Sequence, residues 1–195
     1  DAQAKGSLTQ VEEVFRSIDV ELGAGKVEIS YADVEKVEVE QEDTTGFRCY
    51  VEESTLHVES GKKFGVNNNH AKIVIRIPRN YLFDEFELKV SAGEATVDGI
   101  VANETSIDVD AGKATIKKLD AKEVDISADA GELYLEVVGK QEDYSYNLEC
   151  DVGTILIGEE SYTGLGTEKK INNLNAGRFL EADCDVGNVR VDFTE

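Results

Sequence analysis

Val109-Asp-Ala-Gly-Lys-Ala-Thr-Ile116 is the most informative stretch of this chain, because it recurs with small changes along the sequence. Apolar residues alternate on each side of its central glycine, which predicts two short strands joined at a turn. A short unit that buries one face against its neighbours is typical of stacked β architectures. The six copies are centred on Gly25, Gly93, Gly112, Gly131, Gly153 and Gly187.

Numbering each copy from its glycine gives the residues expected to point into the core. These lie at positions −5, −3, −1, +2 and +4, because period-two spacing on each side of the glycine indicates strands. The step from −1 to +2 breaks that period, so the backbone must turn at the glycine. Glycine reaches backbone angles that strain other residues, which explains its presence there. For Gly112 the inward set is Ile107, Val109, Ala111, Ala114 and Ile116.

The distance between glycines helps to choose between two ways of making this turn. Gly93, Gly112 and Gly131 are 19 residues apart, and Gly153 follows after 22. Nineteen extended residues reach about 63 Å, which is enough to circle a small coil once. The predicted fold is therefore all-β, a short β-solenoid or β-helix-like stack of 19–22-residue coils. An antiparallel β-sandwich of tandem hairpins, each turning at a glycine, is the alternative.

The domain organisation follows from where the repeats lie. Residues 1–17 precede the first copy and are expected to form an entry arm, with Phe15 as its first buried anchor. Residues 18–195 form a single β-repeat domain. Residues 158–178 interrupt the repeat with Gly, Thr, Asn and Lys, which predicts an excursion before the last coil.

Composition excludes some partners and leaves the compartment open. The chain has 41 acidic and 20 basic residues and a net charge of −21, so it repels nucleic acid and anionic lipid. It has no run of 18 apolar residues, so we expect no membrane span. The chain begins at Asp1 and contains no Met. We therefore expect a mature or trimmed form, with room upstream for an export signal or anchor.

The aspartates at position −2 are the candidate metal ligands. In stacked coils they would form a line of carboxylates about 4.8 Å apart. Unit charges at that distance repel by about 0.9 kcal/mol in water, and Ca²⁺, which favours oxygen ligands, would relieve the repulsion. Alternatively, each aspartate caps its own turn and the charges splay into solvent. No other cofactor is expected. The candidates are Asp110, Asp129, Asp151 and Asp185.

Two of the three cysteines share one position in the repeat. Cys150 and Cys184 both lie at −3, so they are either small core residues or a disulfide pair, if their coils are adjacent. Cys49 has no obvious mate.

No catalytic residues can be assigned from the sequence. His57 and His70 are the only histidines, and no serine or cysteine nucleophile can be tied to either. The tyrosines are open to two interpretations, because they could stack on sugars or cover strand edges and coil ends. They are Tyr134, Tyr144, Tyr146 and Tyr162.

The order of the motifs resembles a known bacterial family. The strand Ile73-Val-Ile-Arg-Ile-Pro78 is followed by Phe83 and Phe86, and the chain closes with the repeat around Gly187. Together with the other glycine repeats, these motifs resemble the putative-adhesin family of β-strand-repeat domains, most of whose members have no known function. The resemblance covers residues 15–193. It implies an exported, extracellular or surface-held β-helix-like domain with a role in cell adhesion.

These observations predict a non-enzymatic bacterial cell-surface or envelope module. The resemblance implies a surface glycan or protein as its ligand, and a long, flat repeat face suits a large partner. Two alternatives stay open at this point. One is a polysaccharide-acting enzyme on a β-helix, and the other is a sensory or scaffolding ectodomain.

Overall fold

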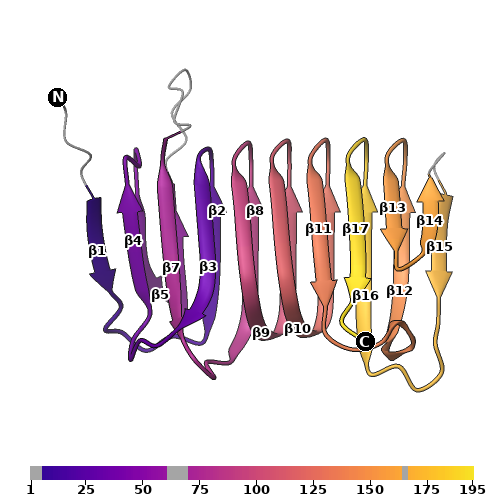
Figure 1. Cartoon of the computed structure of the whole chain (residues 1–195), viewed down its shortest axis with the longest axis horizontal. Helices are drawn as coiled ribbons and strands as arrows, with labels where there is room; N and C mark the ends of the chain where they lie inside the picture. The colour runs from indigo at the N-terminus through magenta and orange to yellow at the C-terminus, as the bar shows by residue number, and fades with distance from the viewer. Residues whose placement is uncertain (1–5, 61–69, 164–166) are drawn as a thin grey trace.

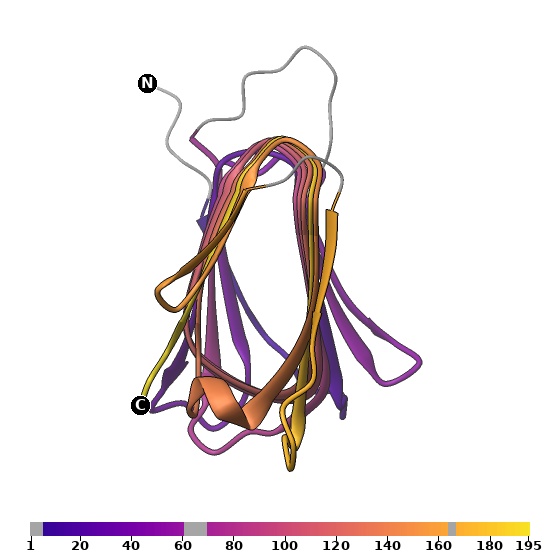
Figure 2. The ribbon, with the colours of Figure 1, turned by 90° about the vertical axis from the view of Figure 1, so that its right-hand side faces the viewer.

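The chain winds into a flattened β-solenoid whose coils stack along one axis (Figure 1). The computed structural model describes residues 6–60, 70–163 and 167–195. Viewed along the stack, the coils superpose as an elongated ring (Figure 2). The strands are β1 (Gly6–Gln10), β2 (Ser17–Leu22), β3 (Lys26–Ala32), β4 (Glu38–Glu42), β5 (Arg48–Glu52), β6 (Thr55–Glu59), β7 (Lys72–Pro78), β8 (Phe83–Val90), β9 (Glu94–Val109), β10 (Lys113–Ala128), β11 (Glu132–Val137), β12 (Tyr144–Cys150), β13 (Thr154–Ile157), β14 (Glu160–Thr163), β15 (Thr167–Ile171), β16 (Arg178–Cys184) and β17 (Asn188–Phe193), with a 3-10 turn at Gln141–Asp143.

Parallel pairing between coils confirms the solenoid and shows that the hairpin sandwich is wrong. The strand before each glycine pairs with the equivalent strand of the next coil, and the strand after it does the same on the opposite wall. The two long strands β9 and β10 contribute to both walls. Each runs from the glycine corner along one wall, bends at Gly99 or Lys118, where φ is positive, and returns along the other. We call the wall formed by the strands that precede the motif glycines the pre-glycine wall, and the wall formed by the strands that follow them the post-glycine wall.

The core fills the space between the walls, and it follows the predicted pattern at four of five positions. In the Gly112 copy, the side chains at −5, −3, +2 and +4 are at most 1% exposed. Burying one such Val, Ile or Leu contributes about 1.5–3 kcal/mol. The prediction for position −1 was wrong. Val152 and Val186 are 72% and 63% exposed, and the alanines at this position also point outward.

Close packing explains both the outward −1 side chain and the glycine beside it. Of the six motif glycines only Gly25 has a positive φ, so unusual backbone angles are not the common reason for glycine. A Cβ added to Gly112 would instead lie 2.2 Å from the carbonyl oxygen of Gly93, and one at Gly187 would lie 2.2 Å from that of Gly131. The glycines stack on one another, and their bare Cα atoms let adjacent coils approach at the corner.

The coils do not stack in the order of the sequence. β16 lies between β10 and β12, and β17 lies between β11 and β13. The Gly187 coil is therefore inserted between the Gly131 and Gly153 coils. The chain leaves one coil position empty after β11 and fills it with its last two strands (Figure 1). At the other end, β2 and β3 likewise lie between the β6–β7 coil and the β8–β9 coil.

Antiparallel strands border both ends of the stack. β4 pairs with β7 on one side and with β1 on the other, while β5 pairs with β6. At the other end, the segment 158–178 supplies β14 and β15, which pair with β13 and β12. Phe15, in the predicted entry arm, is 5% exposed and stacks on Tyr81 with ring centroids 5.5 Å apart.

Substituting a stacked glycine tests the packing of the corner. In Gly112→Ala the new methyl group must displace the Gly93 carbonyl, so we expect a loss of about 1–3 kcal/mol in the free energy of unfolding. Gly177→Ala is the matched control, because a Cβ there meets nothing within 4 Å. Its effect should stay within about 0.5 kcal/mol. Urea denaturation measures both variants, and equal stabilities would contradict the packing explanation.

Candidate functional site

The outer face of the pre-glycine wall is strongly acidic around the predicted calcium ligands. Backbone hydrogen bonds link the residues at or beside Asp110, Asp129, Asp185 and Asp151 from coil to coil, so the four aspartates occupy successive coils in that order. Two positions earlier, the same face carries Asp108, Asp183 and Glu149, with Ser127 between the two aspartates. The structure thus assembles the predicted line of carboxylates.

This acidic face does not form a coordination cage. Across residues 6–60, 70–163 and 167–195, no group of three or more Asp, Glu, His or Cys side chains is placed to hold a metal ion. Asp129, Asp151 and Asp185 are exposed to solvent. Binding of Ca²⁺ by this row stays a prediction.

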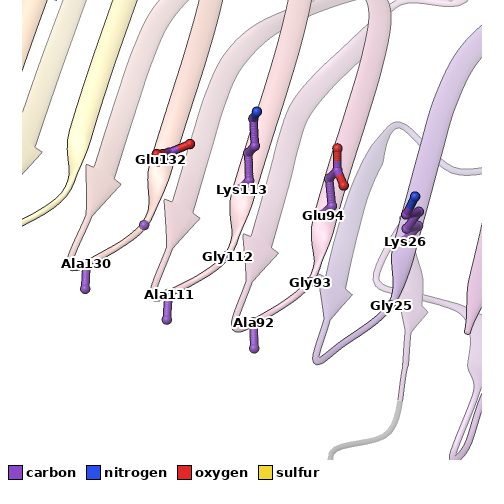
Figure 3. A pocket seen from close by; sticks show the side chains of 11 residues that line it. Gly25, Lys26, Ala92, Gly93, Glu94, Ala111, Gly112, Lys113, Ala130 and Glu132 are labelled. Carbon is purple, nitrogen blue, oxygen red and sulfur yellow. The ribbon is translucent and has the colours of Figure 1, made fainter. Parts of the chain in front are cut away.

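A groove of about 540 Å³ follows the glycine corner. Its floor consists of the stacked glycines, and Ala92, Ala111 and Ala130 project from one rim (Figure 3). The other rim carries position +1, where the charge alternates from coil to coil in the order Lys26, Glu94, Lys113 and Glu132. Small residues and balanced charge make this groove shallow and neutral.

A second hollow, of about 300 Å³, lies on the outer face of the post-glycine wall. One row, at position +3 of the repeat, consists of Tyr134, Arg190 and Leu156, which stand side by side in register on β11, β17 and β13. The other row, at position +1 and nearer the glycine corner, consists of Glu132, Asn188 and Thr154 on the same three strands. Lys113 and the backbone of β11 and β17 complete the lining. We call this surface the Tyr134 hollow.

Short side chains and paired charges give the Tyr134 hollow its chemistry. Asn188 lies in register with Glu132 and Thr154, so its short amide forms the floor. Arg190 donates a hydrogen bond from Nε to Asp192 Oδ2 at 3.0 Å, which orients the guanidinium. Because this pair is balanced and Lys113 offsets Glu132, the hollow is polar but almost neutral. Its amide and hydroxyl groups both donate and accept hydrogen bonds.

Of the four tyrosines considered from sequence, Tyr134 lies in the hollow. Its side chain is half-buried on the outer face of β11, and burial together with a hydrogen bond to Asp192 raises the pKa of its hydroxyl. Tyr144 and Tyr146 are buried in the core, and Tyr162 lies on β14 at the end of the stack, where coverage of coil ends was expected.

Neither histidine is among the residues that line the glycine groove or the Tyr134 hollow. His57 is half-buried on β6, where its ring stacks on Tyr50 at a centroid distance of 4.8 Å and its Nδ1 lies 3.5 Å from Asp19 Oδ2. His70 is exposed immediately before Ala71 and β7. Neither placement assembles a nucleophile and a base.

Sequence reasoning missed Arg190 and Asn188 as site residues. They come from the Gly187 copy, whereas Thr154 and Leu156 come from the Gly153 copy and Tyr134 from the Gly131 copy. The three copies adjoin in the order 131, 187 and 153, which the spacing of the glycines does not reveal. The shared cysteine at −3 of the last two copies was the one signal that could have paired them.

Comparison with known families agrees with this architecture. A family model described as Toastrack DUF4097 matches residues 15–195. The chain belongs to this family. The matched region contains all six glycine copies.

One solved structure shares the fold of this Toastrack chain, and a second aligns with it less well. A protein from Clostridium sporogenes ATCC 15579, described as a putative cell adhesion protein, aligns with a TM-score of 0.61 and 14% identity over 98% of this chain and 100% of its own. A putative adhesin from Bacteroides fragilis NCTC 9343 aligns with a TM-score of 0.44 and 12% identity over 98% of each chain. At 14% identity the likeness to the Clostridium protein concerns the fold alone.

One curated relative matches a shorter part of the chain. A G8 domain-containing protein of Dictyostelium discoideum is 33% identical over 62 residues, which is 32% of this Toastrack chain. The chain spans only 4% of the length of that relative.

Separately, no helix in the described part of the chain is long and apolar enough to cross a membrane.

Neighbouring carboxylates repel one another on the acidic face of the Toastrack chain. Partial burial raises the pKa of Asp183, and the nearby carboxylates of Asp185, Asp151 and Asp129 raise it further. Burial and Asp110 likewise raise the pKa of Asp108, against the opposing effect of Lys89. A carboxyl group with a raised pKa in the folded state binds its proton more tightly there than in the unfolded chain. Its stabilising contribution is present at acid pH and is lost as the pH rises through the raised pKa.

Replacing one of these carboxylates should therefore stabilise the protein at neutral pH. In Asp183→Asn we expect the free energy of unfolding at pH 7 to rise by a few tenths to about 1 kcal/mol, the range for solvent-screened like charges. The gain should shrink as the pH approaches 3.8, the ordinary value for aspartate, because the wild-type group is then protonated. Urea titrations at several pH values measure this dependence.

Asp98→Asn is the control for this substitution. Asp98 is exposed on the opposite wall, in register with Ser30 and Lys117 rather than with carboxylates. We expect no gain in stability at pH 7 from this change. A gain equal to that of Asp183→Asn would show that crowding of the acidic face is not the cause.

Proposed function

We propose that this protein is a non-enzymatic binding module of a bacterial cell surface, and that its ligand is a glycan that places a sugar unit in the Tyr134 hollow. The observation that supports this most directly is the in-register grouping of Tyr134, Arg190 and Leu156 on three adjacent strands, with Asn188 beside them on β17. Membership of the Toastrack family and a similar fold in a protein described as a putative cell adhesion protein agree with the surface role.

The chemistry of the hollow suits an uncharged sugar better than a charged ligand. A sugar ring presents hydroxyl groups at its edge and C–H groups on its faces. Asn188, Thr154 and Arg190 supply donors and acceptors for the hydroxyls, and the Tyr134 ring and Leu156 supply apolar surface. Because the charged groups in and beside the hollow balance in pairs, a net charge on the ligand would gain little there.

A rigid base supports recognition at this surface. The strands that carry the hollow rest on core residues such as Leu133 and Val189, which are 2% and 1% exposed. Side chains held on paired strands lose little freedom on binding, so less of the interaction energy is spent on ordering them. A hollow of about 300 Å³ lies at the small end of ligand sites, which agrees with contact to one sugar unit of a larger glycan.

Binding to a glycan array tests the proposal. We expect the wild-type protein to retain specific glycans without releasing products. Tyr134→Ala and Asn188→Ala should each weaken this binding at least about tenfold, because each removes contacts at the centre of the hollow. Tyr50→Ala is the matched control, since Tyr50 also lies on an outer strand but far along the stack, stacked on His57. Its affinity should match the wild type.

Three results would contradict the proposal. Unchanged glycan binding by Tyr134→Ala would place the site elsewhere. Release of cleaved products from a polysaccharide panel would indicate the polysaccharide-acting enzyme instead. Absence of glycan binding, together with salt-sensitive capture of a basic protein that Asp183→Asn weakens, would assign recognition to the acidic face and a protein partner.

A further inference from the structure

Two buried thiols lie side by side where the inserted last coil meets its outer neighbour. Cys150 ends β12 and Cys184 ends β16, and these parallel strands pair with the two cysteines directly in register. Both side chains point into the core, with exposures of 3% and 0%. They follow Val109 and Ala128 in the inward column at position −3.

The geometry of this pair suits a covalent bond. Neighbouring strands lie about 4.8 Å apart, which falls within the range of Cα separations that disulfides bridge. The sulfur of Cys184 lies 2.7 Å from where a Cβ of Gly153 would stand, so it leans toward the coil that carries Cys150. Cys184 Sγ donates a hydrogen bond to the carbonyl oxygen of Gly187 at 2.9 Å.

We propose that Cys150 and Cys184 form a disulfide when the protein folds in an oxidising environment, and that this bond staples the inserted coil to its outer neighbour. The bond would close a loop from residue 150 to residue 184 that contains β13, β14 and β15. These strands form the outer end of the stack, and β16 and β17 fill the position inside it. The link therefore holds the inserted coil against the outer end of the stack.

The reaction is an exchange with a small disulfide such as oxidised glutathione. Each cysteine thiol loses its proton, one S–S bond forms, and the two electrons reduce the donor disulfide to two thiols, which take up the two protons. Once the coil has closed, the thiols are poorly reactive, because burial and the neighbouring Cys150 raise the pKa of Cys184 to about 12. The bond therefore forms during folding, while the chain end is still open.

Refolding in a glutathione buffer tests the proposal. The Cys49→Ala variant is used because it leaves the proposed pair as its two cysteines. After refolding and alkylation in denaturant without reductant, we expect an intact mass lower by two hydrogens, with no alkyl groups added. Peptide mapping without reductant should then recover Cys150 and Cys184 in one linked peptide. The oxidised form should melt several degrees above the same protein refolded with reductant.

A matched variant separates the bond from other effects of oxidation. Cys49→Ala/Cys150→Ala should melt at the same temperature with or without glutathione disulfide. Alkylation of both thiols in the refolded Cys49→Ala protein would show that no bond forms. If the bond forms but the melting temperature does not change or falls, the bond does not stabilise the inserted coil, and this part of the proposal is contradicted. Neither outcome depends on glycan binding.

Discussion

The glycine corner controls how closely one coil can approach the next. The carbonyl of each motif glycine except Gly153, the last in the stack, accepts a hydrogen bond from the residue after the next glycine, as from Lys113 to Gly93 and from Asn188 to Gly131. The space between these carbonyls and the neighbouring Cα has no room for a methyl group. A side chain there would increase the distance between adjacent coils, and the hydrogen-bonded strands of both walls would lose their register.

Register, in turn, produces the surface chemistry. Because the walls pair in parallel and in register, equivalent positions of the repeat form straight rows across the outer faces. Similar residues in equivalent positions then reinforce one another and concentrate carboxylates on the pre-glycine wall, where partial burial and these neighbouring charges raise the pKa of Asp108 and Asp183. Where residues at equivalent positions differ in length, the surface has raised and hollowed regions. The Tyr134 hollow exists because Asn188 is short where its row neighbours to one side, Lys113 and Glu132, are long.

The inserted last coil links these features at one end of the molecule. The same insertion that places Arg190 between Tyr134 and Leu156 also places Cys184 beside Cys150. A chain that stacked its coils strictly in sequence would keep the two cysteine-bearing coils adjacent, but it would not place Arg190 between Tyr134 and Leu156. The proposed disulfide lies on the pre-glycine wall and the proposed glycan contact on the post-glycine wall, and they rest on separate observations.

The repeat alone predicted a stacked all-β fold, a β-solenoid with the hairpin sandwich as the alternative, because period-two alternation and the recurring glycines are local properties of the chain. The parallel pairing of equivalent strands, which decides for the solenoid, is a property of the tertiary structure. The repeat also gave the inward residues at −5, −3, +2 and +4 and the line of aspartates. Position −1 was mispredicted, because the alternation continues up to the glycine in sequence while the backbone has already begun to turn. Coil order, and with it the Tyr134 hollow and the cysteine pair, depended on the tertiary structure. Hydrogen bonding between equivalent strands is equally compatible with several orders, so only the packing of the complete chain selects one.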